Sequence, residues 1–389
     1  MSGFSRTVIW PLRIADVIRE RGPLTVAAFM DLALYDSEFG YYARAGQRSG
    51  RAGDFFTSVD VGPLFGQLLQ VQLAEMWRLL GSASHTQDGR FDLVEAGAGN
   101  GRLSADILRA ARSHDANFYN AVRLHLVEAS AAARAAQPAT LGDLGDRLSA
   151  SSDALPASFE GVLVANELLD ALPAHQVVVR EDGLREVYVA EDCGEQASGE
   201  RLRLVEGPPS TPALAEYLDR LGVALEPGWR VEINLRALEW IRDAARRLTR
   251  GFIMLIDYGH EARELYSLSH ASGTLTTYAR HQSAGPESNG APAWLQDPGG
   301  RDITAHVDFT SVRAAAEAEG LATLGLLDQT YFVLGLLPAL PDPQSAIRNP
   351  QSKTLLMPGG LGSTHKVLVL GKGVGTPALR CCSFKVRAT

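Results

Sequence analysis

Apolar runs and regularly spaced apolar positions alternate along this chain of 389 residues. The short apolar runs predict six strands, at 91–95, 122–127, 161–165, 252–256, 322–327 and 366–370. Apolar residues at helical spacing predict helices within 11–34 and at 63–80, 103–111 and 309–319, and an alanine-rich helix follows the second strand. Strands that alternate with helices are typical of a parallel sheet covered on both faces, so we expect an α/β fold.

The segment 174–234 departs from this alternation. Two runs in it predict a hairpin around Glu181-Asp182-Gly183, which later runs at 202–205 and 230–233 are expected to extend. The predicted organisation has five parts: an N-terminal helical region with a lid (1–82), the first part of a Rossmann-like domain (83–173), an inserted β-containing substrate subdomain (174–234), the second part of the Rossmann-like domain (235–371) and a C-terminal tail (372–389).

Composition narrows the class of protein. Lys and Arg number 37 and Asp and Glu number 45, and the net charge of −8 disfavours a nucleic-acid binder but suits a basic protein partner. The three cysteines lack metal-ligand spacing, so we expect neither disulfides nor a metal site. We expect the protein to occupy a reducing compartment. No apolar run has membrane-spanning length and the first residues lack a secretory pattern. We expect a bacterial cytoplasmic protein, with the mitochondrial matrix as the alternative; a homodimer is left open.

A glycine-rich loop, Glu95-Ala96-Gly97-Ala98-Gly99-Asn100-Gly101, lies between the first predicted strand and a helix. Glycines there allow a tight turn and close approach of the backbone to a ligand. A plain strand-to-helix turn is the simpler interpretation. The spacing E-x-G-x-G-x-G lacks the third glycine of the G-x-G-x-x-G pattern that binds a pyrophosphate, and it resembles the first motif of class I methyltransferases, which use S-adenosylmethionine.

Glu128 ends the second predicted strand. A carboxylate at this position can accept hydrogen bonds from both hydroxyls of an adenosine ribose. The alternative is a charge that stabilises the N-terminus of the following helix. Ribose binding is favoured because ligands of open α/β sheets bind at the carboxyl ends of the strands.

Asn166, Glu167 and Asp170 follow the third predicted strand and should face the same crevice. If this stretch is helical, Glu167 and Asp170 share one face. A carboxylate pair can hold a guanidinium group bidentately and help to remove its proton, which suits methyl transfer to an arginine. Solvation of Glu167 and local capping by Asp170 are the alternatives.

Several segments together resemble the MidA-type methyltransferases, whose mitochondrial members are complex I assembly factors. The resemblance spans about 11–371. Its segments are Tyr35 to Tyr42, Gly53 to Ser58, Phe65-Gly66, the glycine loop, Ala165 to Pro173, Ile256-Asp257-Tyr258-Gly259 and Asp302 to Phe309. It implies a class I core that uses S-adenosylmethionine. For the mitochondrial members it implies symmetric dimethylation of an arginine on a complex I core subunit, and hence an arginine-bearing protein substrate here.

The resemblance also implies roles for individual residues. The loop from Glu95 through Gly97, Gly99 and Gly101 would hold the cofactor, Glu128 its ribose, and Asn166 with Glu167 would border the methyl group. Four residues would form part of a lid over the cofactor: Asp54, Phe56, Thr57 and Ser58. Asp257 and Tyr258 would face the acceptor, and His306 would orient or deprotonate it. A strand-end turn at 257–259 and a purely structural His306 are the alternatives.

Two other functions are left open. A nucleotide-dependent oxidoreductase would share the fold, although the glycine spacing disfavours it. A non-catalytic assembly or chaperone factor on a methyltransferase scaffold would use the aromatic loop 35–58 and the segment 174–234 as partner surfaces.

Overall fold

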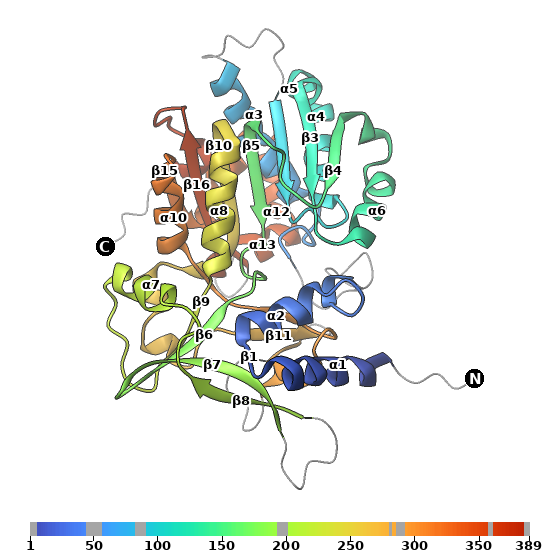
Figure 1. The fold of residues 1–389 in the computed structure, drawn as a ribbon. Coiled ribbons are helices and arrows are strands. Elements are labelled where there is room, and N and C mark those ends of the chain that lie inside the picture. Colours follow the sequence, from blue (N-terminus) through green and yellow to red (C-terminus); the bar gives the residue numbers. More distant parts are fainter. Residues whose placement is uncertain are drawn as a thin grey trace, which may run out of the picture.

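The computed structural model of the chain describes residues 6–43, 57–81, 91–192, 201–279, 282–284, 292–356 and 361–384. These residues form a large sheet with helices packed against it and, below it in Figure 1, a second layer that contains a smaller sheet and the helices α1 (Arg6–Arg21) and α2 (Val26–Tyr35). Within the described residues, no helix is both long enough and apolar enough to cross a lipid bilayer.

The large sheet has the strand order β15-β16-β10-β5-β2-β3-β4, with β14 beside the end of β10. Its strands are β2 (Phe91–Ala96), β3 (Val122–Val127), β4 (Leu148–Ser152), β5 (Phe159–Asn166), β10 (Leu248–His260), β14 (Val307–Asp308), β15 (Ala322–Asp328) and β16 (His365–Lys372). All six strands predicted from apolar runs are present, which confirms the α/β fold. The predictions did not include β4, because it is a mostly exposed edge strand rich in serine.

The prediction of a parallel sheet is wrong for one strand. β16 pairs antiparallel with both β10 and β15, whereas β10, β5, β2, β3 and β4 run parallel to one another. The connection explains the direction, because β15 ends at Asp328, opposite Lys366 near the start of β16. A parallel neighbour would need a crossover that returns the chain to the opposite end of the strands. Here the connection begins and ends at the same end of the strands; its elements are α11 (Gln329–Leu336), η5 (Leu337–Ala339), α12 (Pro343–Arg348), α13 (Pro350–Leu356) and α14 (Leu361–Thr364).

Helices cover both faces because alternate residues of each strand point to opposite sides. On one face, Val162 and Val164 of β5 belong to a core that includes α3 (Leu64–Gly81), α4 (Arg102–His114) and α5 (Ala116–Ala121). On the other face, Leu163 and Ala165 belong to a core with α8 (Leu235–Arg247) and α10 (Phe309–Ala318). Beside β3 and β4, α6 (Ala131–Leu141) and η2 (Gly142–Arg147) complete this part.

The ends of α10 follow the ordinary chemistry of helix caps. Asp308 accepts hydrogen bonds from the backbone N–H groups of Thr310 and Ser311, which caps the helix. Gly320 follows the helix with a φ of +85°, a left-handed conformation that glycine adopts without a steric penalty.

The second layer contains the predicted hairpin of β6 (His175–Arg180) and β7 (Gly183–Asp192). As predicted, β8 (Arg201–Gly207) and β9 (Arg230–Ile233) extend it, and α7 (Ala213–Leu221) connects the two. The short β1 (Leu24–Thr25) also joins β7, which the sequence did not predict.

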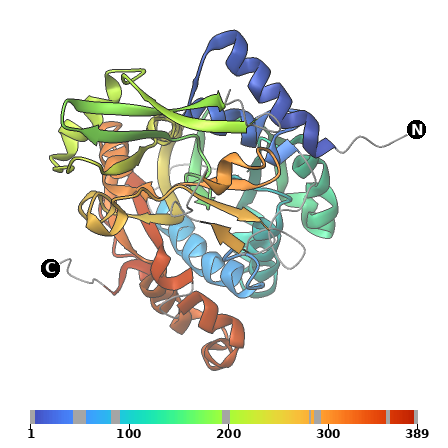
Figure 2. The same ribbon diagram turned by 90° about the horizontal axis from the view of Figure 1, so that it is seen from below.

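The core of this layer combines distant parts of the chain. It contains Phe29 of α2, Val187 of β7 and Trp294 of η4 (Ala293–Leu295). A three-stranded sheet of β11 (Thr276–Ala279), β12 (Gln282–Ala284) and β13 (Asp302–Thr304) belongs to the same region, as the view from below shows (Figure 2). Part of the segment assigned to the second Rossmann-like half therefore packs with the N-terminal helices. Four short helices complete the described fold: η1 (Tyr41–Ala43), α9 (Ala262–Leu265), η3 (Leu268–His270) and η6 (Arg380–Cys382).

Candidate active site

The glycine loop between β2 and α4 adopts a backbone that favours glycine at each of three positions. Gly97, Gly99 and Gly101 have φ values of +72°, +52° and +83°. A Cβ on Gly97 would lie 3.2 Å from Leu168 Cδ1, and one on Gly101 would lie 3.2 Å from Leu126 Cδ1. Both distances are shorter than ordinary contacts, so a side chain at either position would be strained as well as crowded.

Glu128 is fixed beside this loop by backbone hydrogen bonds. Its Oε2 accepts from Gly99 N–H at 2.8 Å and its Oε1 from Ser130 N–H at 2.7 Å. The preceding residue, Val127, accepts from Gly97 N–H at 2.9 Å. A carboxylate offers about four lone-pair directions, so two remain for a ligand.

A cavity of about 600 Å³ opens at the carboxyl ends of β2, β3 and β5. Its lining includes Gly97, Glu128 and Glu167, three of the predicted site residues. Asp153 after β4 and Arg236, Glu239 and Trp240 of α8 also line the cavity, and the sequence did not predict them. Asp153 was missed together with β4. The spacing of Leu238, Ile241 and Ala245 on one face of α8 was the signal that could have located that helix.

The segment after β5 is a turn and not a helix, so Glu167 and Asp170 do not share a helix face. Glu167 has a φ of +50°, unusual for a residue other than glycine. Asp257 lies beneath the turn, and its Oδ2 accepts from the N–H groups of Leu168 at 3.1 Å and Leu169 at 2.7 Å. These hydrogen bonds hold a conformation that costs about 1–3 kcal/mol in an unsupported chain.

The Glu167 carboxylate reaches the cavity from this turn. Its Oε1 accepts from Ser58 N–H at 3.2 Å and from Asn166 Nδ2 at 3.3 Å, and it lies 3.4 Å from His365 Nε2. The ring of His365 stacks on that of Tyr258, with centroids 3.8 Å apart. Three separate segments therefore meet at this carboxylate, and Tyr258 of a fourth packs behind His365.

Asp170 lies deeper than Glu167. Burial, with added repulsion from Asp257, Asp302 and Glu167, raises its pKa well above the ordinary value. Its Oδ1 is buried and has no hydrogen-bond partner within the described part of the chain. Tyr42 donates to Asp302 Oδ1 at 2.8 Å on the same side of the site.

Comparison with known proteins assigns the chain to a family. Residues 68–327 match the family described as "Putative S-adenosyl-L-methionine-dependent methyltransferase". The chain belongs to this family. The mouse protein arginine methyltransferase NDUFAF7, mitochondrial, is 32% identical over 344 residues, which cover 81% of this chain and 71% of the relative. The fruit fly homologue, also named as mitochondrial, is 29% identical over 394 residues, covering 92% and 83%.

A solved structure supports the same assignment. It is a COG1565 superfamily member from Burkholderia thailandensis bound to S-adenosyl-homocysteine, 28% identical, with a TM-score of 0.85 over 100% of this chain and 98% of that one. This methyltransferase therefore uses S-adenosylmethionine, and its MidA-type resemblance is confirmed. These findings count against the oxidoreductase alternative.

Three of the remaining predicted cofactor residues, Glu95, Thr57 and Ser58, are not part of the cavity lining. Glu95 is buried in β2, where its Oε2 accepts from the N–H and hydroxyl groups of Ser104, and burial raises its pKa to about 7. The Glu95 carboxyl group is therefore hydrogen-bonded to Ser104 in the first turn of α4. Thr57 and Ser58 are held beside α4, because Asp60 accepts from Thr57 N–H at 3.0 Å and from Arg102 Nη1 at 2.8 Å. Asp54 and Phe56, the other lid residues, lie outside the described residues.

The predicted acceptor residues are divided between two places. Asp257 is 1% exposed and supports the turn, and Tyr258 packs on His365. His306 lies next to Ala305, whose N–H donates to the Asp170 carbonyl at 2.9 Å, but the His306 ring packs beside those of His260 and His270. Burial lowers the pKa of His306 to about 4. The structure therefore brings Glu167, Asp170 and Asp257 together and directs the His306 side chain elsewhere.

Proposed function

We propose that this methyltransferase transfers a methyl group to an arginine side chain of a protein. The observation that carries the proposal is the Glu167 carboxylate, held at the cavity by Ser58 N–H and Asn166 in front of the buried Asp170. An anionic, partly dry surface suits a guanidinium, which is planar, permanently cationic and able to form two parallel hydrogen bonds to one carboxylate. The names of the relatives support the same acceptor.

The residues around the cavity fit the cofactor. The side-chain-free loop at Gly97 and Gly99 leaves room for its amino-acid part, and the two uncommitted lone-pair directions of Glu128 suit the ribose hydroxyls. Asp153, at the end of the neighbouring strand, is placed to accept from the adenine amino group. Bound S-adenosylmethionine supplies an electrophilic methyl group on a cationic sulfur.

Glu167 has two tasks in this proposal. It orients the guanidinium so that one nitrogen faces the methyl group, and it accepts the proton that this nitrogen loses as the nitrogen–carbon bond forms. Asp170, a buried carboxyl group whose pKa is raised well above the ordinary value, adds a second acidic group to this side of the site. Asp257 acts through the turn, because its backbone hydrogen bonds set the direction of Glu167.

The finer expectations stay predictions. They are symmetric dimethylation, a complex I core subunit or its bacterial counterpart as the acceptor, and a homodimer. The relatives named above as mitochondrial support the matrix alternative, whereas the solved relative comes from a bacterium. A bacterial cytoplasmic location is one of these predictions.

The test uses the full chain, S-adenosylmethionine labelled in its methyl group, and a lysate from cells that lack the protein. We expect label in one main protein and, after acid hydrolysis, in methylated arginine. Label in another amino acid would contradict the proposed acceptor. Cofactor binding without any transfer would instead favour the assembly-factor alternative.

A further inference from the structure

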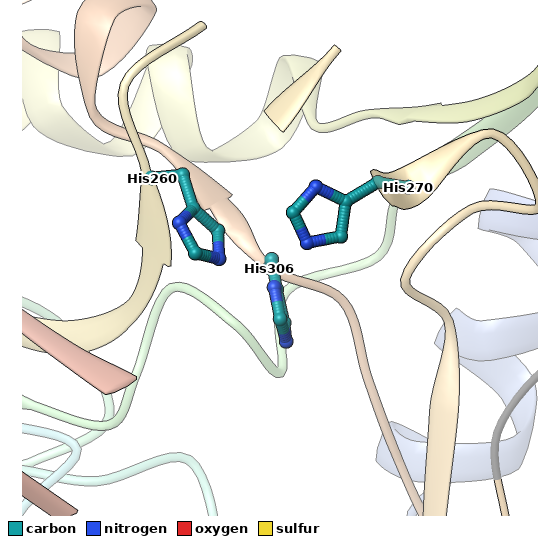
Figure 3. Close-up of side chains that lie close together, drawn as sticks. All are labelled: His260, His270 and His306. Carbon is teal, nitrogen blue, oxygen red and sulfur yellow. The ribbon is translucent and has the colours of Figure 1, made fainter. Parts of the chain in front are cut away.

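Three histidines from separate segments meet beyond the carboxyl end of β10. His260 ends β10, His270 ends η3, and His306 directly precedes β14. Their ring centroids lie 4.9, 5.2 and 5.9 Å apart, and one nitrogen of each ring lies within 4.8 Å of the others. Figure 3 shows the three side chains lying close together, each carried by a different segment.

Glu264 of α9 lies beside two of these rings. Its backbone oxygen lies 3.0 Å from His270 Nδ1, so His270 Nε2 keeps a free lone pair if Nδ1 carries the proton. Its carboxylate Oε1 lies 3.0 Å from His260 Nδ1, which is buried and makes no hydrogen bond to any described residue. Histidines that bind metals are oriented in this way, with one ring nitrogen donating to a carboxylate or a backbone carbonyl and the other facing the ion.

His306 supplies the third nitrogen donor. Its backbone N–H donates to Thr274 Oγ1 at 3.0 Å, which fixes the start of the side chain. Its Nδ1 is buried and makes no hydrogen bond to any residue that the structure describes. A buried polar atom without a partner is costly, so a ligand at this point would satisfy it.

We propose that His260, His270 and His306 bind one divalent transition-metal ion of the zinc class. Neutral imidazole suits such ions, and zinc–nitrogen distances of about 2.0–2.1 Å place tetrahedral ligand atoms about 3.4 Å apart. The present separations of up to 4.8 Å require the rings to close by as much as about 1.4 Å through side-chain rotations. A water molecule would complete the coordination, because the Glu264 carboxylate faces His260 Nδ1.

The role of this ion would be to join three segments. It would tie the end of β10 and the η3 loop to the segment before β14, whose Ala305 donates to the Asp170 carbonyl. Lys366 is a nearby cation, but its ion pair with Asp328 reduces its electrostatic repulsion of a bound metal ion. A metal-bound His306 would have its lone pair engaged, so this proposal excludes His306 as the base for the acceptor.

The test is metal binding by the full chain after treatment with a chelator. Zn²⁺ titrated by calorimetry is expected to bind one ion per chain, and Co²⁺ is expected to give the visible absorption bands of a tetrahedral site. His270→Ala should weaken Zn²⁺ binding by at least about tenfold and abolish the Co²⁺ bands, and Glu264→Gln should weaken it by about tenfold. S-adenosylmethionine affinity, measured on each variant, verifies that it has folded.

His114→Ala is the matched control, because His114 is an exposed histidine at the end of α4. This variant should bind Zn²⁺ like the unmodified chain. Two results would overturn the proposal: an unmodified chain that does not bind Zn²⁺ at one ion per chain, or a His270→Ala variant that binds it with unchanged affinity.

Discussion

The cofactor side and the acceptor side of the cavity are built in different ways. On the cofactor side, Gly99 and Glu128 lie close in the fold and satisfy each other through a backbone hydrogen bond. On the acceptor side, Glu167 has a left-handed backbone and depends on contacts from Ser58 and Asn166, while Asp257 supports the turn from below. The cofactor side therefore joins the ends of two adjacent strands, which sequence motifs can reveal. The acceptor side depends on contacts such as that between Ser58 and Glu167, which are 109 residues apart.

The difference between the two sides is tested most strongly by Glu167→Gln. The amide keeps the size of the side chain but removes the charge that holds a guanidinium and the site that accepts its proton. We expect the rate of methyl transfer to fall about a thousandfold, in the range of a lost general base, with cofactor affinity within about threefold of normal. Radiolabel transfer and calorimetry measure the two quantities. An equal loss in both would contradict the division into two sides.

Glu95→Gln tests the buried carboxyl group beneath the cofactor side. Because folding raises the pKa of Glu95 from 4.5 to about 7, the folded state binds the extra proton, and the unmodified chain loses stability as pH rises between these values. A glutamine has no such pH dependence and can still accept from Ser104. The variant should therefore gain about 3 kcal/mol over the unmodified chain between pH 4.5 and pH 8.

Urea unfolding of both proteins across this pH range measures that gain. Other buried acids, such as Asp170, contribute equally to both proteins, so the difference between the two curves isolates Glu95. Parallel curves would show that Glu95 is ionised in the folded protein throughout, and that burial does not raise its pKa.

Glu128→Gln tests the ribose contact. Replacing a charged acceptor by a neutral one costs about 1.5 kcal/mol, so we expect cofactor affinity to fall about tenfold. Calorimetry measures the affinity, and Glu181→Gln in the exposed β6–β7 turn is the control. Unchanged cofactor affinity in Glu128→Gln would contradict the ribose contact, and the known interactions of the Glu128 carboxylate would be those with Gly99 and Ser130.

Asp60→Asn should have the smallest effect. It weakens the ion pair to Arg102, which is partly exposed, and the contact to Thr57, so the segment that carries Ser58 is held less firmly. We expect methyl transfer to slow by about threefold, since an asparagine oxygen still accepts from Thr57 N–H and a neutral acceptor keeps about half of the charge-assisted bond to Arg102. Asp16→Asn, in an exposed pair with Arg19, is the control and should leave the rate unchanged. A loss as large as that of Glu167→Gln would show that this segment determines the acceptor side.

The sequence predicts features that depend on neighbouring residues. The glycine loop, the hairpin of β6 and β7, and the cap at Asp308 follow from local turn and capping chemistry. The apolar strands are recognisable because both faces of the sheet are covered. Glu128 could be placed in the cavity because the rule for strand ends is general to this class of sheet.

Other features depend on contacts that the sequence pattern does not record. β4 has little apolar surface to reveal it, and Asp153 was lost with it. The turn at Glu167 depends on Asp257, which lies 88 residues beyond Leu169 in the chain. The direction of β16 depends on a connection from β15 that begins and ends at the same end of the strands. The cluster of His260, His270 and His306 has no recognisable ligand spacing, so its members could be linked only through the fold.

Cofactor and acceptor are expected to meet between Glu128 and Glu167, and every role assigned to the cavity depends on that meeting point. A crystal structure of the full chain with S-adenosyl-homocysteine is the decisive measurement. We expect the ribose hydroxyls within about 3 Å of the Glu128 carboxylate and the sulfur facing Glu167 across the cavity. A ligand bound elsewhere, or in this cavity with its sulfur turned away from Glu167, would refute this arrangement.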